Sequence, residues 1–460
     1  VFADGSYWGT YSLVPPVDGA PVRIDKADLL QGLAVAGATP GATMLVVPDA
    51  CLLVTPAGNG GPCTYPDYQP VAVEMLRQSA TLRDRVAMLD MPGALVPANW
   101  TPDAMKSEAE AFYEAIAPAQ GCFSYGAAYG PALQSSLMSA ADLLYACLKG
   151  TAASTTLMNN LLTTQALALH PPASDPAQPG VPVHSAAFEE VAAHIAAAFP
   201  APGATPIPSV PPGVTGLTPA PVLEVAMSSA AVQEPAATDT VAIEALDRFL
   251  LDAVPLLGRI QEVLAAKLNL VPPSGALAGI WTRNDAGRGV WNAPANMSVN
   301  EVVHPVVNLS DDEQGGFNVP VNGNAINILR DFNNRGTVVW GARTLDGNSL
   351  DYRYIQVRRT LIYIEQSIKL SLQQFALAPN EASTWTVVVA SISSFLTGLW
   401  QAGGLMGSQA SDAFSAACGL GSTMAGQDVL DGRMIVSVTV QMIHPAEFIE
   451  LTFIQAMQGD

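Results

Sequence analysis

The sequence predicts an α/β fold: an N-terminal α/β domain, a variable insertion, and a C-terminal α+β domain that ends in two strands. Three observations lead to this prediction. Short apolar runs alternate with amphipathic helical patterns over residues 25–129, an Ala- and Pro-rich stretch occupies residues 134–239, and two segments of alternating apolar residues close the chain. A chain of 460 residues is expected to form two or three domains.

The N-terminal part alternates strands and helices. A helix is expected to begin at Asp25, because aspartate is a favourable N-cap residue. The patterns predict, in order, buried strands over 43–48, 86–90 and 123–129, and helices over 68–82 and 102–117 between them. Strands that alternate with helices in this way form a parallel sheet. A further short strand is expected near Tyr11–Val14.

The middle of the chain changes in composition. The patterns predict, in order, a helical stretch over 134–170, a loop over 171–182, a helix over 185–199, a loop over 200–222 and a helix over 240–268. Pro255 is expected to divide the last helix. We therefore expect domains over 1–133, 134–239 and 240–432, and a terminal arm over 433–460.

The C-terminal part mixes strands and helices. In order, the patterns predict a strand over 275–282, a strand pair over 338–340 and 354–357, helices over 361–374 and 385–402, a short helix or strand over 411–418, and strands over 434–442 and 448–457. Apolar residues that share one face of the last two strands are Met434, Val436, Val438, Val440 and Met442, then Ile449, Leu451 and Phe453.

Five arginines crowd into residues 335–359, although the whole chain has only 20 Lys and Arg residues. They are Arg335, Arg343, Arg353, Arg358 and Arg359. Two interpretations are equally supported. Guanidinium groups bind carboxylates through two hydrogen bonds, so the arginines are candidates for ion pairs within the chain, for example Arg358 with Glu365, or with a neighbour. Alternatively, they form a solvated basic edge of the predicted strand pair.

Composition and motifs exclude several functions. The formal net charge of −20 disfavours nucleic-acid binding, which needs a basic surface. No uninterrupted apolar run approaches ~20 residues, so no membrane insertion is expected. The five cysteines have no metal-ligand spacing. The sequence also lacks a Gly-Lys-Ser/Thr phosphate loop, a Gly-x-Ser-x-Gly elbow and a His-Glu-x-x-His motif, so no catalytic, cofactor or metal residues are predicted.

Several motifs point to one family. The segments are LLQGLA (29–34), TMLVVPDA (43–50), LRDRVAMLD (82–90), YGAAYGPAL (125–133), VPPSGALAGIWTRNDAGRGVWNAPAN (271–296), VWGARTL (339–345) and PAEF (445–448). In sequence and order they resemble contractile tail sheath proteins, the outer sleeves of contractile phage tails, R-type bacteriocins and extracellular contractile injection systems. Residues 134–270 have no counterpart in this resemblance. The family also carries an N-terminal arm before these motifs, which this sequence is expected to lack.

The resemblance implies a structural subunit that polymerises helically around an inner tube and contracts to drive the tube through a target envelope. The implied partners are further copies of the chain in stacked rings, the inner tube protein, and baseplate and terminal cap proteins, without any cofactor. Assembly in the bacterial cytoplasm is implied, with a final place in a phage tail or a released or cell-associated particle. The alternating residues of the two terminal strands would then pair between subunits, and the arginines would meet carboxylates.

A second class remains open from the residues alone: an α/β hydrolase-like enzyme with a C-terminal oligomerisation domain. The alternation of strands and helices allows such an enzyme. The missing catalytic motifs and the family resemblance weigh against it. We therefore expect a structural protein and no enzyme.

Overall fold

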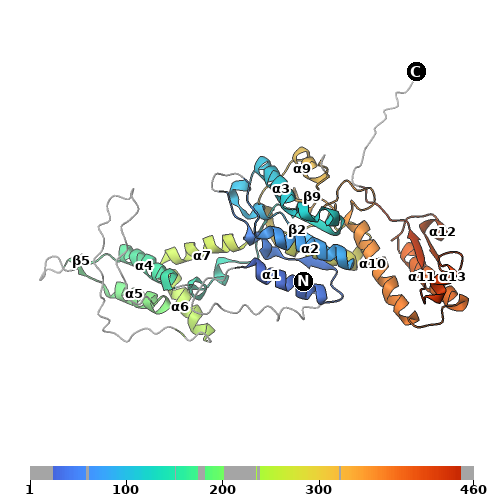
Figure 1. Ribbon diagram of the computed structural model, residues 1–460. Coiled ribbons are helices and arrows are strands. Elements are labelled where there is room, and N and C mark those ends of the chain that lie inside the picture. The colour runs from blue at the N-terminus through green and yellow to red at the C-terminus, as the bar shows by residue number, and fades with distance from the viewer. Residues whose placement is uncertain are drawn as a thin grey trace, which may run out of the picture. The chain divides into compact units, whose positions relative to one another are not determined.

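The computed structural model describes residues 24–57, 62–150, 152–174, 182–200, 235, 239–320 and 323–446. These residues divide into two compact units. Unit 1 contains Ile24–Gln134 and the described chain from Val271 onward, and unit 2 contains Ser135–Leu270 (Figure 1). The strand expected near Tyr11–Val14 and the second terminal strand, over 448–457, lie outside the described residues.

The core of unit 1 is a five-stranded sheet in the order β1-β2-β3-β9-β10. Its strands are β1 (Met44–Val46), β2 (Val86–Asp90), β3 (Gly126–Gly130), β9 (Ile326–Phe332) and β10 (Gly336–Val339). The first four are parallel, and β10 pairs antiparallel with β9. Strand β9 joins β3 in the register Ala128↔Ile326, so the sheet that begins in the N-terminal part is completed by strands about 200 residues later in the chain.

Three helices accompany the first three strands: α1 (Lys26–Ala38), α2 (Tyr68–Leu82) and α3 (Pro102–Ile116). Local signals fix where they begin, because the side chains of Asp25 and Thr101 accept hydrogen bonds from the first turns of α1 and α3. Helix α1 also receives polar support, since the Arg85 guanidinium donates to the carbonyls of Ala36 and Thr39. This contact satisfies carbonyl groups at the end of the helix.

Residues expected to form a strand over 275–282 instead form α8 (Ser274–Arg288), so that prediction is wrong. Its buried residues Leu277, Ala278, Trp281 and Asn284 recur at helical spacing. Two prolines precede the helix, and a glycine with a positive φ follows it, as at many helix ends. The strand had been expected because Gly289, Pro294 and Asn296 suggested tight turns beside a short apolar segment.

The strand pair expected over 338–340 and 354–357 is also wrong. Residues 336–339 do form a strand, β10, but its partner is the preceding strand β9. Residues 355–357 form the first turn of α10 (Ile355–Leu372). The turn after β10 contributes only an isolated antiparallel bridge between Arg343 and Tyr354. The other edge of β10 is hydrogen-bonded to residues 296–299, since the Val339 N–H donates to the Met297 carbonyl and the Val299 N–H donates to the Thr337 carbonyl.

The rest of unit 1 follows α10. It comprises η8 (Gln373–Phe375), α11 (Ala382–Gln401), α12 (Ala410–Ala413), β11 (Phe414–Ala417), α13 (Gly426–Leu430) and β12 (Ser437–Val440). Its core contains Ile364 of α10 and one face of α11, namely Val388, Ile392, Leu396 and Leu399. Among the described residues, α11 alone is long and apolar enough to cross a membrane, by length and composition only. Serines and threonines interrupt its apolar positions, which is why the sequence showed no such run.

Unit 2 is mainly helical and has its own core. Its helices are α4 (Ala152–Leu169), α5 (Ala186–Ala198), α6 (Thr240–Ala253) and α7 (Pro255–Leu268), with short turns η6 (Ala140–Asp142) and η7 (Tyr145–Leu148) and a hairpin of β5 (Ala173–Ser174) and β6 (Pro182–Val183). Phe188, Phe199, Leu250 and Leu257 are buried together. The helices after residue 239 therefore pack with this unit, whereas the sequence placed them in the following domain.

Short elements complete the chain: η2 (Pro48–Leu53), η3 (Pro92–Leu95), η4 (Pro97–Asn99), η5 (Ala117–Tyr125), β4 (Leu133–Ser135), β7 (Leu270–Val271), β8 (Val302–Pro305) and α9 (Asp311–Asn318). Helix α9 begins with a capping box formed by Ser310 and Glu313. The acidic residues Asp311, Asp312 and Glu313 therefore form the first turn of a capped helix.

Candidate functional site: a sheet edge and an arginine cluster

Strands β11 and β12 form an antiparallel pair near the end of the described chain. The register places Ser415 opposite Thr439 and Ala416 opposite Val438. One face of the pair packs on the core beside α11, and the apolar residues that contact this core are Met434, Val436, Val438, Val440 and Met442. Their shared face, predicted from the alternating sequence, is therefore directed into the chain's own core.

The outer edge of β12 is set by the hydrogen-bond pattern. The Gln441 N–H donates to the Ala413 carbonyl at 2.8 Å, so residue 441 directs its backbone toward β11. In an antiparallel strand this direction alternates, and the backbone groups of Val438 and Val440 point to the opposite edge. Within the described part of the chain, the sheet has two strands only. An unpaired strand edge of this kind is a template for another strand.

Three of the five arginines, Arg343, Arg358 and Arg359, are buried. Arg359 donates two hydrogen bonds to the Asp285 carboxylate, at 2.8 and 2.5 Å, and its guanidinium lies 4.5 Å from the centre of the Trp281 ring. Both partners are on α8. Because Arg359 is only 6% exposed, this ion pair joins α10 to α8 inside unit 1.

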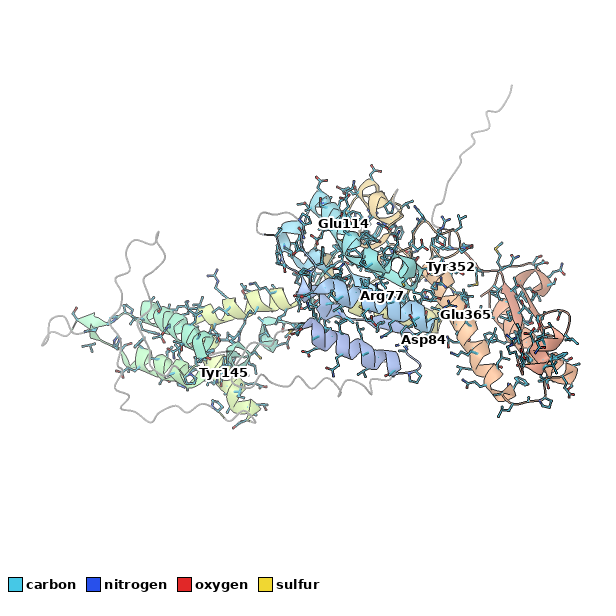
Figure 2. All side chains as sticks on the ribbon, in the orientation of Figure 1. Arg77, Asp84, Glu114, Tyr145, Tyr352 and Glu365 are labelled. Atoms are coloured by element: carbon cyan, nitrogen blue, oxygen red, sulfur yellow. The ribbon has the colours of Figure 1, made fainter. Side chains whose placement is uncertain are left out.

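Arg358 lies between two aromatic rings, 4.1 Å from the centre of Tyr125 and 3.7 Å from that of Tyr352. Its guanidinium also donates to the carbonyl and hydroxyl oxygens of Ser124. Glu365, the carboxylate expected as its example partner within the chain, is exposed (Figure 2). Arg358 is therefore held by stacking between the two rings and by its hydrogen bonds to Ser124.

The other three arginines donate hydrogen bonds to residues in turns and loops. Arg335 donates to the Asn296 side chain at 2.7 Å, and Arg353 donates to the Ser349 carbonyl at 2.9 Å. Arg343 is 4% exposed and, among its partners, donates to the Gly347 carbonyl at 3.1 Å. Arg343, Arg358 and Arg359 are buried and so form no solvated edge, whereas Arg335 is exposed.

The carboxyl edge of the parallel sheet is where α/β enzymes bind ligands. Here Asp90, the last residue of β2, is buried and accepts hydrogen bonds from the Ser274 hydroxyl and, at 2.7 Å, from the Ser274 N–H. Burial raises the pKa of the Asp90 carboxyl to about 7, against the opposing effect of those hydrogen bonds. Asp90 therefore anchors the start of α8 on β2, with its carboxylate closed off from solvent.

The thiols of Cys51 and Cys63 are also buried. Burial raises the pKa of the Cys51 thiol well above its ordinary value and that of Cys63 to about 11. These thiols are therefore protonated and poor nucleophiles. Within the residues that the structure describes, no group of three or more His, Cys, Asp or Glu side chains could hold a metal ion.

Sequence reasoning missed the partners that organise this region. Asp90, Asp285 and Ser124 were not singled out, and Tyr125 and Tyr352 appeared only within longer segments. Asp90 could have been found, because an aspartate that ends a buried apolar run must be capped or paired. Asp285 and Ser124, the polar partners of Arg359 and Arg358, could not, because they lie 74 and 234 residues away in the sequence.

The open edge of the two-stranded sheet offers backbone groups to which a further strand can add. Residues 348–456 match the family described as "Phage tail sheath C-terminal domain". A stretch of 146 residues, 31% of the chain, is 30% identical to the "Tail sheath protein" of Burkholderia phage BcepMu. These two matches confirm the resemblance to tail sheath proteins.

Solved structures include further relatives. The chain is 40% identical to a chain of the anti-feeding prophage (AFP) baseplate, over 41% of this chain and 51% of that one, with a TM-score of 0.39. It is 42% identical to a chain of the PVC sheath complex, an extracellular contractile injection system in the contracted state, over 41% and 52% of the two chains, with a TM-score of 0.39. The match spans 30% of the phage protein and about half of each solved chain.

Proposed function

We propose that this chain is a structural subunit of a contractile sheath, which polymerises helically around an inner tube and contracts to drive that tube through a target envelope. The observation that carries the proposal is the match of residues 348–456 to the tail sheath C-terminal domain. This segment contains α10, α11 and the open β11–β12 sheet. No observation favours the alternative α/β hydrolase-like enzyme, whose ligand edge would be the buried surroundings of Asp90.

The link between subunits would be strand addition at β12. The outward backbone groups of Val438 and Val440 can accept a strand from a neighbouring copy, while their side chains stay in the core of their own subunit. Ile449, Leu451 and Phe453, the proposed donor residues, lie outside the described residues. Backbone pairing of this kind ties subunits together and still lets each core rotate and slide, which contraction requires.

Contraction would use stored free energy. In this proposal the extended sheath is a trapped state, and contraction gains contacts between subunits without a nucleotide or other cofactor. The inward-facing arginines would keep unit 1 rigid during this movement, since Arg359 and Arg358 tie α10 to α8 and to the residues just before β3. Unit 2 would be an insertion carried by that core.

Other copies of the chain and a baseplate are the partners best supported, since related chains are described as parts of a sheath complex and of a baseplate. An inner tube protein and a terminal cap would complete the particle. Assembly would take place in the bacterial cytoplasm, and the particle would be a phage tail or a contractile injection system.

Electron microscopy of the purified chain tests the proposal. We expect helical tubes or sleeves for the full chain and none for a variant that ends after residue 446. This end point keeps β12, which packs on the core. Deletion of the whole arm expected over 433–460 would remove β12 as well. A folded truncated protein that still forms sleeves would contradict strand exchange. A full-length protein that stays a soluble dimer with hydrolase activity would contradict the sheath itself.

A further inference from the structure

The chain beyond β12 takes a defined path within unit 1. Met442 forms an isolated antiparallel bridge with Leu405, so the backbone is still paired at this point. Two residues later, the ring centre of His444 lies 5.8 Å from that of Tyr354, with the two rings tilted by 58°. Tyr354 is the residue that precedes the first turn of α10. The chain therefore reaches the start of α10 at its root, which we define as residues 443–446.

Tyr354 offers a fixed surface to the root. Its backbone forms an isolated bridge with Arg343, and its carbonyl accepts a hydrogen bond from the Arg358 N–H at 3.2 Å. The guanidinium carbons of Arg343 and Arg353 lie 6.0 and 5.9 Å from the centre of the Tyr354 ring, within the range of cation–π attraction. Two of the five crowded arginines thus hold the ring that His444 contacts.

The sequence stiffens the root further. Pro445 follows His444, and a proline restricts the residue before it to extended conformations while its own φ is nearly fixed. His444 is exposed, so its contact with Tyr354 adds little to the core of unit 1. The held ring and the stiff backbone instead set the direction in which the chain continues.

We propose that His444 is a positioning residue for strand exchange: its ring, held against Tyr354, fixes the point from which the C-terminal arm leaves each subunit. The inference rests on the proposed function and deepens it, because Ile449 is the first of the proposed donor residues. The extended chain from His444 to Ile449 spans at most about 17 Å. The β12 edge of the accepting copy therefore lies within about 17 Å of His444, which limits the neighbours and orientations that can take up the strand.

Holding the root also prepares the arm for assembly. A segment that is free before assembly loses conformational entropy when it is fixed, and a segment that is already held loses less. This gain cannot exceed the strength of the contact that holds the segment. For a pair of aromatic rings, that strength corresponds to about a 2- to 10-fold change in an equilibrium constant.

The first test asks whether His444 holds the root in the unassembled chain. The Met406 N–H donates to the Gln441 carbonyl at 2.9 Å, so hydrogen exchange of this amide reports on the chain just before the root. We expect exchange at Met406 to be about 2- to 10-fold faster in His444→Ala, and unchanged in His444→Phe, which keeps a ring. The matched control is His304→Ala, because His304 is an exposed histidine of β8. Wild-type exchange in His444→Ala would overturn the proposal.

The second test measures the lowest protein concentration at which sleeves form, by sedimentation and electron microscopy. We expect this concentration to rise about 2- to 10-fold in His444→Ala and to return to the wild-type value in His444→Phe. His444→Ala should keep the wild-type melting temperature, because the side chain is exposed, and His304→Ala should assemble like wild type. An unchanged concentration in His444→Ala, or an equal rise in His304→Ala, would contradict the positioning role.

The two failures can be told apart. If the wild-type chain forms no sleeves at any concentration, the proposed function fails, and positioning for strand exchange fails with it. If wild type and His444→Ala form sleeves at the same concentration, the proposed function stands and the role of His444 is refuted.

Discussion

Arg359 of α10 binds Asp285 of α8 through two hydrogen bonds while it stacks over Trp281 of the same helix. The contact connects the segment that matches the tail sheath C-terminal domain to α8, whose first residue, Ser274, is bound by Asp90. Helix α8 is therefore fixed at both ends: Asp90 of β2 holds its first residue, and Arg359 holds its last turn. A substitution that breaks the contact at either end should change the stability of unit 1.

Loss of the ion pair should destabilise unit 1. We expect Arg359→Met to lower the free energy of unfolding by about 2–3 kcal/mol, because Asp285 would keep a partly buried charge without its partner. Arg359→Lys should cost less, since it keeps the charge but loses the two-point contact. Urea denaturation measures both. In a double-mutant cycle with Asp285→Asn, we expect a coupling energy of about 1–2 kcal/mol. Independent effects would show that stacking on Trp281 alone fixes Arg359.

The Asp90 carboxyl should make stability depend on pH. Its pKa is raised to about 7 in the folded chain and is ordinary in the unfolded chain, so the folded state binds the proton more tightly. Its favourable contribution is complete below pH 4 and is lost as the pH rises toward and through about 7. Asp90→Asn should remove this dependence, because the amide can accept from the Ser274 N–H and donate to the Ser274 hydroxyl.

The measurement is the free energy of unfolding at pH 5 and pH 8. Relative to wild type, Asp90→Asn should gain on the order of 2–4 kcal/mol between these two values. The exposed Asp103→Asn is the matched control and should follow the wild-type curve. Parallel curves for wild type and Asp90→Asn would mean that the carboxyl is already ionised at pH 5 or that another group dominates.

Removal of the stacked guanidinium should loosen the segment around Tyr352. Arg358→Met keeps an unbranched side chain but loses the hydrogen bonds to Ser124 and the contacts with the rings of Tyr125 and Tyr352. We expect a loss of about 2 kcal/mol in the free energy of unfolding, and faster hydrogen exchange over residues 343–354. Glu365→Gln should change neither quantity, because Glu365 is exposed. A comparable effect of Glu365→Gln would instead support an ion pair between Arg358 and Glu365.

Proline substitutions can separate the two edges of β12. The Val438 N–H points to the outer edge, so Val438→Pro should keep the β11–β12 ladder and block an incoming strand. The Thr439 N–H points to β11, so Thr439→Pro should break the ladder within the subunit. We expect Val438→Pro to remain folded, within about 1 kcal/mol of wild type, and to form no sleeves. Circular dichroism measures whether each variant is folded, and electron microscopy shows whether it forms sleeves. Sleeves from folded Val438→Pro would exclude this edge as the acceptor.

Much of the N-terminal half could be predicted because its signals are local. The expected helix over 68–82 coincides with α2, and the expected strand over 86–90 coincides with β2. A few neighbouring residues are enough to specify the helix caps at Asp25 and Thr101 and the continuous apolar runs. The prediction of a strand over 275–282 was wrong because its local signal was ambiguous. A short apolar segment with glycines suits either state, and packing of Trp281 in the core decided for a helix.

The site divides in the same way. The alternation of Met434, Val436, Val438, Val440 and Met442 determined that one face of the last described strand is apolar, because side chains alternate across a strand. The sequence by itself also determined the acidic charge and the family motifs. Only the tertiary structure decided that this face packs on α11, that β12 pairs with β11, and that Arg359 meets Asp285. Those outcomes depend on which distant segments share a core, and no local pattern encodes that choice.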